Sequence, residues 1–261
     1  QIKIESDAFS NILSAKMIIY TNNKSIEQLS EKKIGLFTSI EIKSPIESIG
    51  NNAFSNYTAL KHISLPESIN SIGDNAFLNC ISLLEIKIPS LVTSIGNNAF
   101  MGCSKLHNII CNPSLNTIGE KAFKRCVSFT EILIPSTVKL VQQYAFSECY
   151  SLKKIIIDFD STKVEEKAFD ECSKECHLII KSIKSETEND DNNNNKDIKI
   201  SDIGQFSNIT LPNSISNIPK YLLSKCSLLR EISIPTTVTK INQSSFSECS
   251  SLTKINLPES V

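Results

Sequence analysis

The chain lacks the features that draw a protein to nucleic acid or into a membrane. Its 261 residues include 27 basic and 28 acidic side chains, for a net charge of −1. No strong positive field is therefore available to attract nucleic acid or anionic lipid. No apolar run approaches the ~20 residues that a membrane-spanning helix requires. We expect no nucleic-acid partner and no membrane insertion within this chain.

The usual catalytic signatures are also missing. There are only three histidines, and the sequence has no His-x-x-x-His, Cys-x-x-Cys or Gly-x-Ser-x-Gly segment. No glycine-rich phosphate loop follows an expected strand. Glu85 and Glu131 fall two predicted turns apart, ~10 Å, which is too far for an acid–base pair. We predict a non-enzymatic protein with no cofactor and no metal ion.

What the chain has instead is a repeat, because a large apolar residue returns every 23 residues. The positions are Phe54, Phe77, Phe100, Phe123, Phe146 and Phe169, and after an interruption Leu223 and Phe246. Each stands in the frame apolar-Gly-x-x-Ala-Phe-x-x-Cys-x-x-Leu-x-x-Ile-x-Ile-Pro, of which residues 72–89 are one copy. A fixed period of about 20–50 residues is typical of a solenoid, whose units bury their apolar faces against their neighbours. At this period the chain forms roughly eleven turns.

Each repeat predicts one short strand and one tight turn. The alternation Leu83-x-x-Ile86-x-Ile88 is typical of a strand, and Pro89 ends it because proline cannot donate to a ladder. Four glycines share a column four residues before the phenylalanine, where we expect a turn with positive φ. They are Gly50, Gly73, Gly96 and Gly119. The Asn-Asn-Ala-Phe type of segment that follows predicts one helical or 3₁₀ turn, with Ala and Phe facing the core.

This frame resembles that of the BspA-like leucine-rich repeat family. The resemblance is strong over residues 46–181 and 206–261 and weak over 12–37. It implies an α/β solenoid, a right-handed horseshoe with a parallel β-sheet on its concave side and short helical or 3₁₀ turns on its convex side. It also implies secreted or cell-surface proteins that bind other macromolecules.

We expect a single solenoid domain over residues 1–261. Its turns are degenerate over about 10–40, where Ile18, Tyr20, Ile26 and Leu29 are the expected inward residues. Residues 184–197 predict a disordered, acidic, Asn-rich insertion, because residues 186–197 contain no apolar side chain. The chain opens and stops within a repeat, so we expect it to be a piece of a longer protein.

The nine cysteines favour a core role over disulfides or zinc. Seven share the column three residues after the phenylalanine: Cys80, Cys103, Cys126, Cys149, Cys172, Cys226 and Cys249. Two other turns place Tyr57 and Ile203 there, which indicates an apolar column in which cysteine packs as a small hydrophobe. Cys111 falls in an inward strand column. Cys176 falls in a mostly polar column, so it is the best candidate for a reactive or paired thiol, although a partly covered bystander fits its position too.

The outward position in the middle of each strand is the candidate binding site. From turn to turn it holds Ser64, Lys87, Ile110, Leu133, Ile156, Ile179, Thr210, Ser233 and Asn256. Ile110, Leu133, Ile156 and Ile179 form what we call the aliphatic stripe, ~15–20 Å long. We expect a polar rim of Lys87, Asn108, Glu131, Lys154 and His177 around it. An apolar patch inside a polar rim is typical of a binding surface.

Two other interpretations of the stripe stay open: β-branched residues suit strands in any case, and a further part of the protein could cover them. The favoured function is a protein-binding module that holds a protein or glycoprotein partner on the concave sheet. By resemblance it is secreted or on the cell surface and mediates adhesion. One alternative is a cytoplasmic scaffold, since unpaired thiols suit a reducing compartment. Another is a structural element that self-associates end to end.

Overall fold

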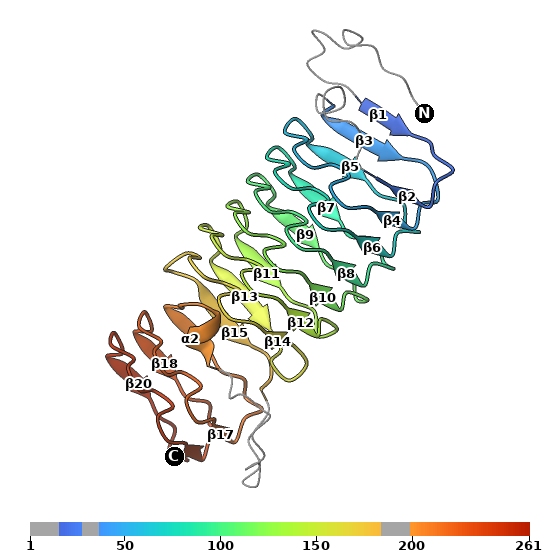
Figure 1. Ribbon diagram of the computed structural model, residues 1–261. Coiled ribbons are helices and arrows are strands. Elements are labelled where there is room, and N and C mark those ends of the chain that lie inside the picture. The colour runs from blue at the N-terminus through green and yellow to red at the C-terminus, as the bar shows by residue number, and fades with distance from the viewer. Residues whose placement is uncertain (1–15, 28–36, 184–198) are drawn as a thin grey trace.

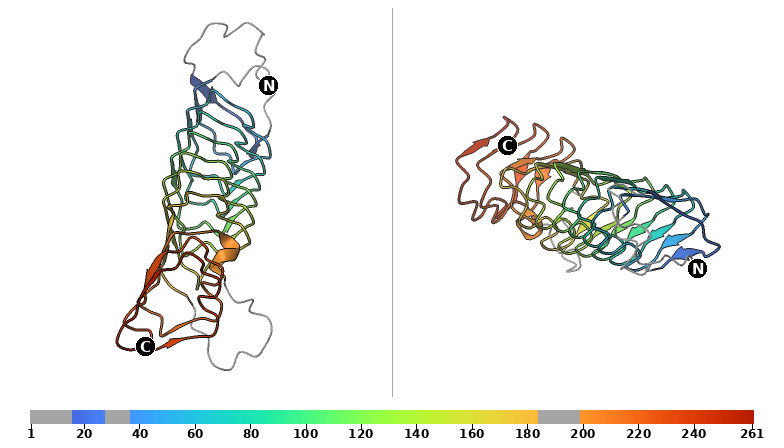
Figure 2. Two further views of the ribbon diagram at one scale, coloured as in Figure 1. Left: turned by 90° about the vertical axis from the view of Figure 1, so that its left-hand side faces the viewer. Right: turned by 90° about the horizontal axis from the view of Figure 1, so that it is seen from above.

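The computed structural model describes residues 16–27, 37–183 and 199–261. They form a parallel-sheet β-solenoid, a long column with slight curvature rather than a pronounced horseshoe (Figures 1 and 2). Each turn adds one strand to a first sheet and one to a second. About nine turns of the described chain carry both strands, compared with the eleven turns expected from the period.

Most strands pair in parallel with their counterparts one turn away, and the first sheet holds the longer ones. Its strands are β1 (Lys16–Ile19), β3 (Ser39–Ile42), β5 (His62–Ser64), β7 (Glu85–Lys87), β9 (Asn108–Ile110), β11 (Glu131–Leu133), β13 (Lys154–Ile157), β15 (His177–Ile180), β16 (Asn208–Thr210), β18 (Glu231–Ser233) and β20 (Lys254–Asn256). Those of the second sheet are β2 (Ser25–Ile26), β4 (Ser48–Ile49), β6 (Ser71–Ile72), β8 (Ser94–Ile95), β10 (Thr117–Ile118), β12 (Leu140–Val141), β14 (Lys163–Val164), β17 (Asn217–Ile218) and β19 (Lys240–Ile241). The first sheet is interrupted between β5 and β7, β9 and β11, and β16 and β18.

The Ala-Phe segment forms a double turn, so the expected helical or 3₁₀ turn is wrong. Asn75 and Asn79, two residues before and two after Phe77, have φ of 54° and 56°, and the same two positions are left-handed in every other Ala-Phe turn. A right-handed helix cannot pass through such residues. Their N–H groups bond to the next turn instead, as Phe77 N does to Ala99 O at 2.7 Å. In the described chain the one helix is α2 (Ile200–Ile203), which takes the place of an Ala-Phe turn.

The glycine column has a different cause from the one expected. Positive φ at glycine occurs at Gly102, which lies outside the column. Glycine is required at the column's glycine positions because the backbones of successive turns are in contact there. A Cβ added to Gly96 would lie 2.5 Å from the carbonyl carbon of Gly73 and 2.6 Å from the amide nitrogen of Asp74. Close backbone approach, rather than backbone conformation, excludes a side chain at these positions.

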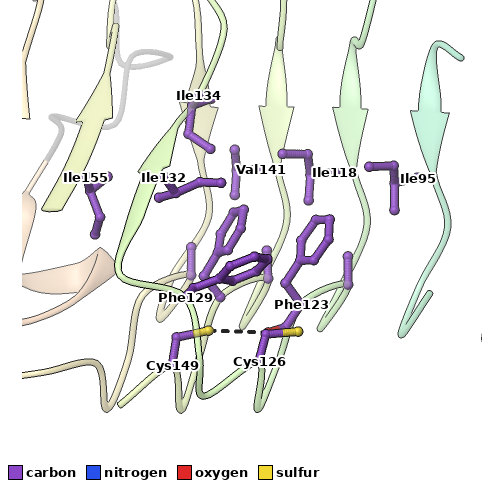
Figure 3. Packing of buried hydrophobic residues seen from close by; sticks show 14 of the residues in the cluster. Ile95, Ile118, Phe123, Cys126, Phe129, Ile132, Ile134, Val141, Cys149 and Ile155 are labelled. Atoms are coloured by element: carbon purple, nitrogen blue, oxygen red, sulfur yellow. Dashed lines mark hydrogen bonds between the residues drawn. The ribbon is translucent and has the colours of Figure 1, made fainter. Parts of the chain in front are cut away.

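The core lies between the two sheets and the Ala-Phe turns, and its axis is a stack of phenylalanine rings. Phe100 is fully buried, with its ring centroid 5.0 Å from that of Phe77 and 5.2 Å from that of Phe123. The rings are parallel within 4° and 1°. Figure 3 shows Phe123 and Phe129 between inward Ile and Val side chains of both sheets and the cysteines of the turns. The predicted inward face of the repeat is therefore confirmed.

The N-terminal turn differs from expectation. Ile18 is 40% and Tyr20 69% exposed, so both face outward, while Ile19 and Ile26 are buried. The reason is register, because β1 pairs with β3 so that Ile19 lies beside the inward Ile42. A shift of one residue moves a strand's side chains to the opposite face. Leu29 and the predicted insertion over 184–197 lie outside the described residues.

Candidate functional site

The aliphatic stripe lies on the outward face of the first sheet. Ile110 is 58% and Leu133 48% exposed, while Ile156 and Ile179 are half-buried. Leu133 is the register partner of Ile156, which is in turn the partner of Ile179. Thr210 follows Ile179 and returns the column to polar residues. Three of the four predicted residues are thus neighbours in one hydrogen-bonded ladder.

The ladder is interrupted between Ile110 and Leu133. Ile110 pairs with Lys87 in β7 and β9, whereas β11 begins the next ladder. No backbone hydrogen bond joins β9 to β11, both of which lie in the described part of the chain. The second sheet continues without a break from β2 to β14. The first sheet is interrupted in the same way between β5 and β7 and between β16 and β18, so the break between Ile110 and Leu133 is one of three that the uniform repeat did not indicate.

The predicted rim residues are largely engaged with one another or with nearby side chains. Lys87 Nζ lies 2.6 Å from Glu67 Oε1, and Lys154 Nζ lies 2.9 Å from Glu131 Oε1. His177 Nε2 is 2.7 Å from Thr210 Oγ1. Partial burial, together with the Lys154 ammonium, lowers the pKa of His177 below its usual value. The predicted rim residues on β11, β13 and β15 therefore carry little unpaired charge at neutral pH.

Two lysines that sequence reasoning did not single out carry the free charge. Lys153 immediately precedes β13, and Lys181 immediately follows β15; both are exposed. Neither makes an ion pair within the described residues. Lys181 is the next outward position after His177 and Ile179 in the alternation of the strand. The two-residue period of the sequence therefore predicts that its side chain faces outward. That Lys153 is free could be known only from the structure.

The cysteine column is confirmed as core. All nine cysteines are free, and six of the seven column thiols donate hydrogen bonds to main-chain carbonyls of the preceding turn. Cys126 Sγ, for example, lies 3.2 Å from Phe100 O, and Cys149 Sγ lies 3.3 Å from Phe123 O (Figure 3). Burial raises the pKa of Cys149 to about 12.

Cys176 is not the exposed thiol that its column predicted. It is fully buried, and burial raises its pKa to about 12. Cys176 stands four positions after Cys172, whereas Leu152 stands three positions after Cys149. Cys176 N bonds to Ser173 O as Leu152 N bonds to Cys149 O, so the thiol takes the leucine position and Glu175 is left exposed. The expectation of a reactive or paired thiol is therefore wrong.

These thiols should resist alkylation in the folded protein. With a pKa of about 12, the thiolate that reacts is on the order of one part in ten thousand at pH 8. We expect mass spectrometry after iodoacetamide treatment to show no label on Cys149 or Cys176, and all nine cysteines labelled in urea. Rapid modification of folded Cys176 would contradict its placement.

Outside the first sheet, the best-formed ionic cluster surrounds Glu148. Its carboxylate lies 2.7 Å from Lys124 Nζ and 2.6 Å from Arg125 Nε, and its side chain is 13% exposed. Hydrogen bonds from Lys124 and Arg125 lower the pKa of Glu148 to about 2 from an ordinary 4.5. These ion pairs connect two adjacent Ala-Phe turns, which indicates that the cluster stabilises the fold.

The Glu148 cluster predicts a pH-dependent contribution to stability. Because the folded pKa lies below the unfolded one, the contribution is complete above about pH 4.5 and is lost as pH falls toward about 2. Glu148→Gln should lower the free energy of unfolding by about 1–2 kcal/mol at pH 7. The difference from wild type, measured by urea denaturation, should shrink below pH 4.5. Glu85→Gln, an exposed control, should show no such trend.

Sequence comparison assigns the repeat to a family. The family model described as BspA type leucine rich repeat region matches residues 1–107, 71–199 and 193–261, with six copies. The chain belongs to this family. No curated protein gives a significant match to this BspA-type chain.

Solved structures similar to this BspA-type chain include a leucine rich cell surface protein from Faecalibacterium prausnitzii. It is 22% identical with a TM-score of 0.47, and the match covers 85% of this chain and 73% of that one. A leucine-rich repeat protein from T. pallidum is 20% identical with a TM-score of 0.43, covering 83% and 78%.

A second candidate site on the BspA-type solenoid lies beside α2. A depression of about 320 Å³ there is lined by Glu166, Lys167, Asp170, Ser201, Asp202, Gly204 and Gln205. Within residues 16–27, 37–183 and 199–261, no group of three or more His, Cys, Asp and Glu side chains is placed to hold a metal ion. None of those segments contains a helix with the length and hydrophobicity to cross a bilayer. The first sheet remains the stronger candidate.

Proposed function

We propose that this chain is a non-enzymatic protein-binding module that holds its partner on the outward face of the first sheet. The observation that carries the proposal is the aliphatic stripe, in which four successive turns place an aliphatic residue in one outward column. The other described turns place Ser, Lys, Thr, Asn or Glu there, except for Ile18 in the N-terminal turn. Ile110 and Leu133 are about half exposed. Burying them against a partner would stabilise the complex by roughly 1–2 kcal/mol each.

The surroundings of the stripe support a protein partner. Polar and charged residues border it, and a polar rim around an apolar centre is the usual anatomy of a protein interface. The Glu131–Lys154 ion pair orders the side chains on one flank before any partner arrives. Ordered side chains lose less conformational entropy on binding.

For location, the proposal is the cell surface or the outside of the cell, with adhesion as the role, as membership of the family implies. A specific observation favours a second candidate, an intracellular scaffold, because all nine cysteines are free. Free thiols persist more readily in a reducing compartment. Antibody labelling of intact against permeabilised cells separates the two: labelling of intact cells supports adhesion, and labelling only after permeabilisation supports the scaffold.

The site itself is tested by replacing Leu133 and Ile156 together with lysine. The matched control replaces Ser233 and Asn256, which occupy the same outward column on β18 and β20. We expect at least one protein retained by the immobilised wild-type chain to be lost from the Leu133/Ile156 variant and kept by the control. Identical retention by all three chains, with unchanged circular dichroism, would reject the stripe as the binding site.

A further inference from the structure

The spacing of the stripe restricts the shape of what can lie along it, and this inference rests on the proposed function. Neighbouring strands of a sheet lie about 4.8 Å apart, so the four stripe residues span about 14 Å along the solenoid axis. An α-helix presents one apolar residue per turn to a surface, every 5.4 Å on average. Over three intervals the helix advances about 16 Å, which is within about 2 Å of the stripe.

An extended segment along the same axis does not match. Its side chains face one side every second residue, about 6.8 Å apart. Over three intervals it advances about 20 Å, so its outer residues would miss Ile110 and Ile179.

The free charge beside the stripe is positive. On β11, β13, β15 and the residues that adjoin them, the charged groups are Glu131, Lys153, Lys154, Asp158, His177 and Lys181. Glu131 and Lys154 neutralise each other. Asp158 accepts hydrogen bonds from Ser182 Oγ and from the amide of Asp160, so it is satisfied within its own loop. These neutral donors leave the charge of Asp158 in place, so among the described residues the unpaired charges are Lys153, Lys181 and Asp158, a net charge of +1.

We infer that the stripe binds an acidic amphipathic α-helix of the partner protein, about twelve residues long and lying along the solenoid axis. Its apolar residues recur at i, i+4, i+7 and i+11 and rest on Ile110, Leu133, Ile156 and Ile179. Glutamate or aspartate on its flanks faces Lys153 and Lys181. The insertion predicted over 184–197 cannot take this role, because its residues 186–197 contain no apolar side chain.

The test uses the full chain and fluorescence anisotropy with three labelled peptides of about fourteen residues. The first has leucines at i, i+4, i+7 and i+11 with glutamates on the flanks. The second has the same residues permuted so that the leucines alternate as in a strand, and the third replaces the glutamates with lysines. We expect the first peptide to bind at least tenfold more tightly than either of the others.

Protein variants locate the binding. Leu133→Lys should weaken binding of the first peptide at least tenfold, whereas Ser233→Lys, in the same column four turns away, should change it less than twofold. Replacing Lys153 and Lys181 with glutamate should weaken binding of the acidic peptide and strengthen binding of the lysine-flanked peptide. Wild-type sedimentation as a dimer that Leu133→Lys disperses would overturn the inference in favour of a second copy of this chain.

Equal binding of the helical and strand-patterned peptides would also overturn it, as would no binding of the acidic peptide up to about 1 mM. These failures are distinguishable from failure of the proposed function. If a retained protein still depends on Leu133 and Ile156 while the helical peptide does not bind, the surface stands and the helical partner is rejected. If neither depends on the stripe, both are rejected.

Discussion

Replacing Phe100 with alanine should lower the free energy of unfolding by about 3–5 kcal/mol. Its ring is fully buried between those of Phe77 and Phe123, at centroid distances of 5.0 and 5.2 Å. The neighbouring turns are held at their spacing by the two sheets and by the Ala-Phe turn bonds, so the cavity cannot close by collapse. Dispersion contacts on both faces of the ring are lost together.

The measurement is urea denaturation followed by circular dichroism, with the midpoint and slope compared with wild type. Leu91→Ala is the control, since Leu91 is 55% exposed and its loss should cost no more than about 0.5 kcal/mol. A Phe100→Ala variant as stable as the Leu91→Ala variant would contradict a close-packed ring stack.

The second large effect is expected at Gly96. Replacement by alanine places a Cβ 2.5 Å from the carbonyl carbon of Gly73, and both contacting groups are backbone that cannot turn aside. The two turns must separate locally, at a cost of about 1–3 kcal/mol. Asn242→Ala is the matched control, because the same column already holds a side chain in that later turn, and it should cost no more than about 0.5 kcal/mol.

Denaturation of both variants distinguishes close approach from backbone conformation. If φ at the column glycine were the constraint, alanine and larger residues would be penalised alike. Under close approach, the cost should rise from Gly96→Ala to Gly96→Val, since each added methyl meets the turn before. Equal stability of Gly96→Ala and wild type would refute the contact.

The 23-residue period predicted the parallel strands, the buried phenylalanine column and the inward cysteines because all three follow from identical units stacked in register. The double turn at Ala-Phe was missed for a physical reason. Left-handed conformations fall on Asn75 and Asn98 but also on Lys121 and Tyr144. Lysine and tyrosine rarely adopt positive φ, so their presence in the sequence does not indicate such a turn. Bonds to the next turn, which no single repeat contains, hold them there.

Local shifts of inward positions account for the other errors. The turn of Cys176 keeps the 23-residue period, since Lys154 pairs with His177, but the loop before the strand is shifted by one residue. Column counting therefore placed Cys176 in solvent, although its thiol fills a leucine position. Ile18 was assigned inward without a neighbouring repeat to set its register. The candidate stripe was predicted residue by residue, whereas the junction between β9 and β11 and the free ammonium groups of Lys153 and Lys181 depend on contacts between turns that the sequence does not state.

The most direct test of the account is photo-crosslinking from the stripe. A photoreactive benzoylphenylalanine replaces Leu133 in one chain and Ser233 in another, and each is irradiated with the cells or extracts in which the protein occurs. We predict a discrete protein adduct from position 133 and none of that mass from position 233. Equal adducts from both positions, or none from position 133, would contradict the assignment of the first sheet's aliphatic stripe as the partner-binding surface.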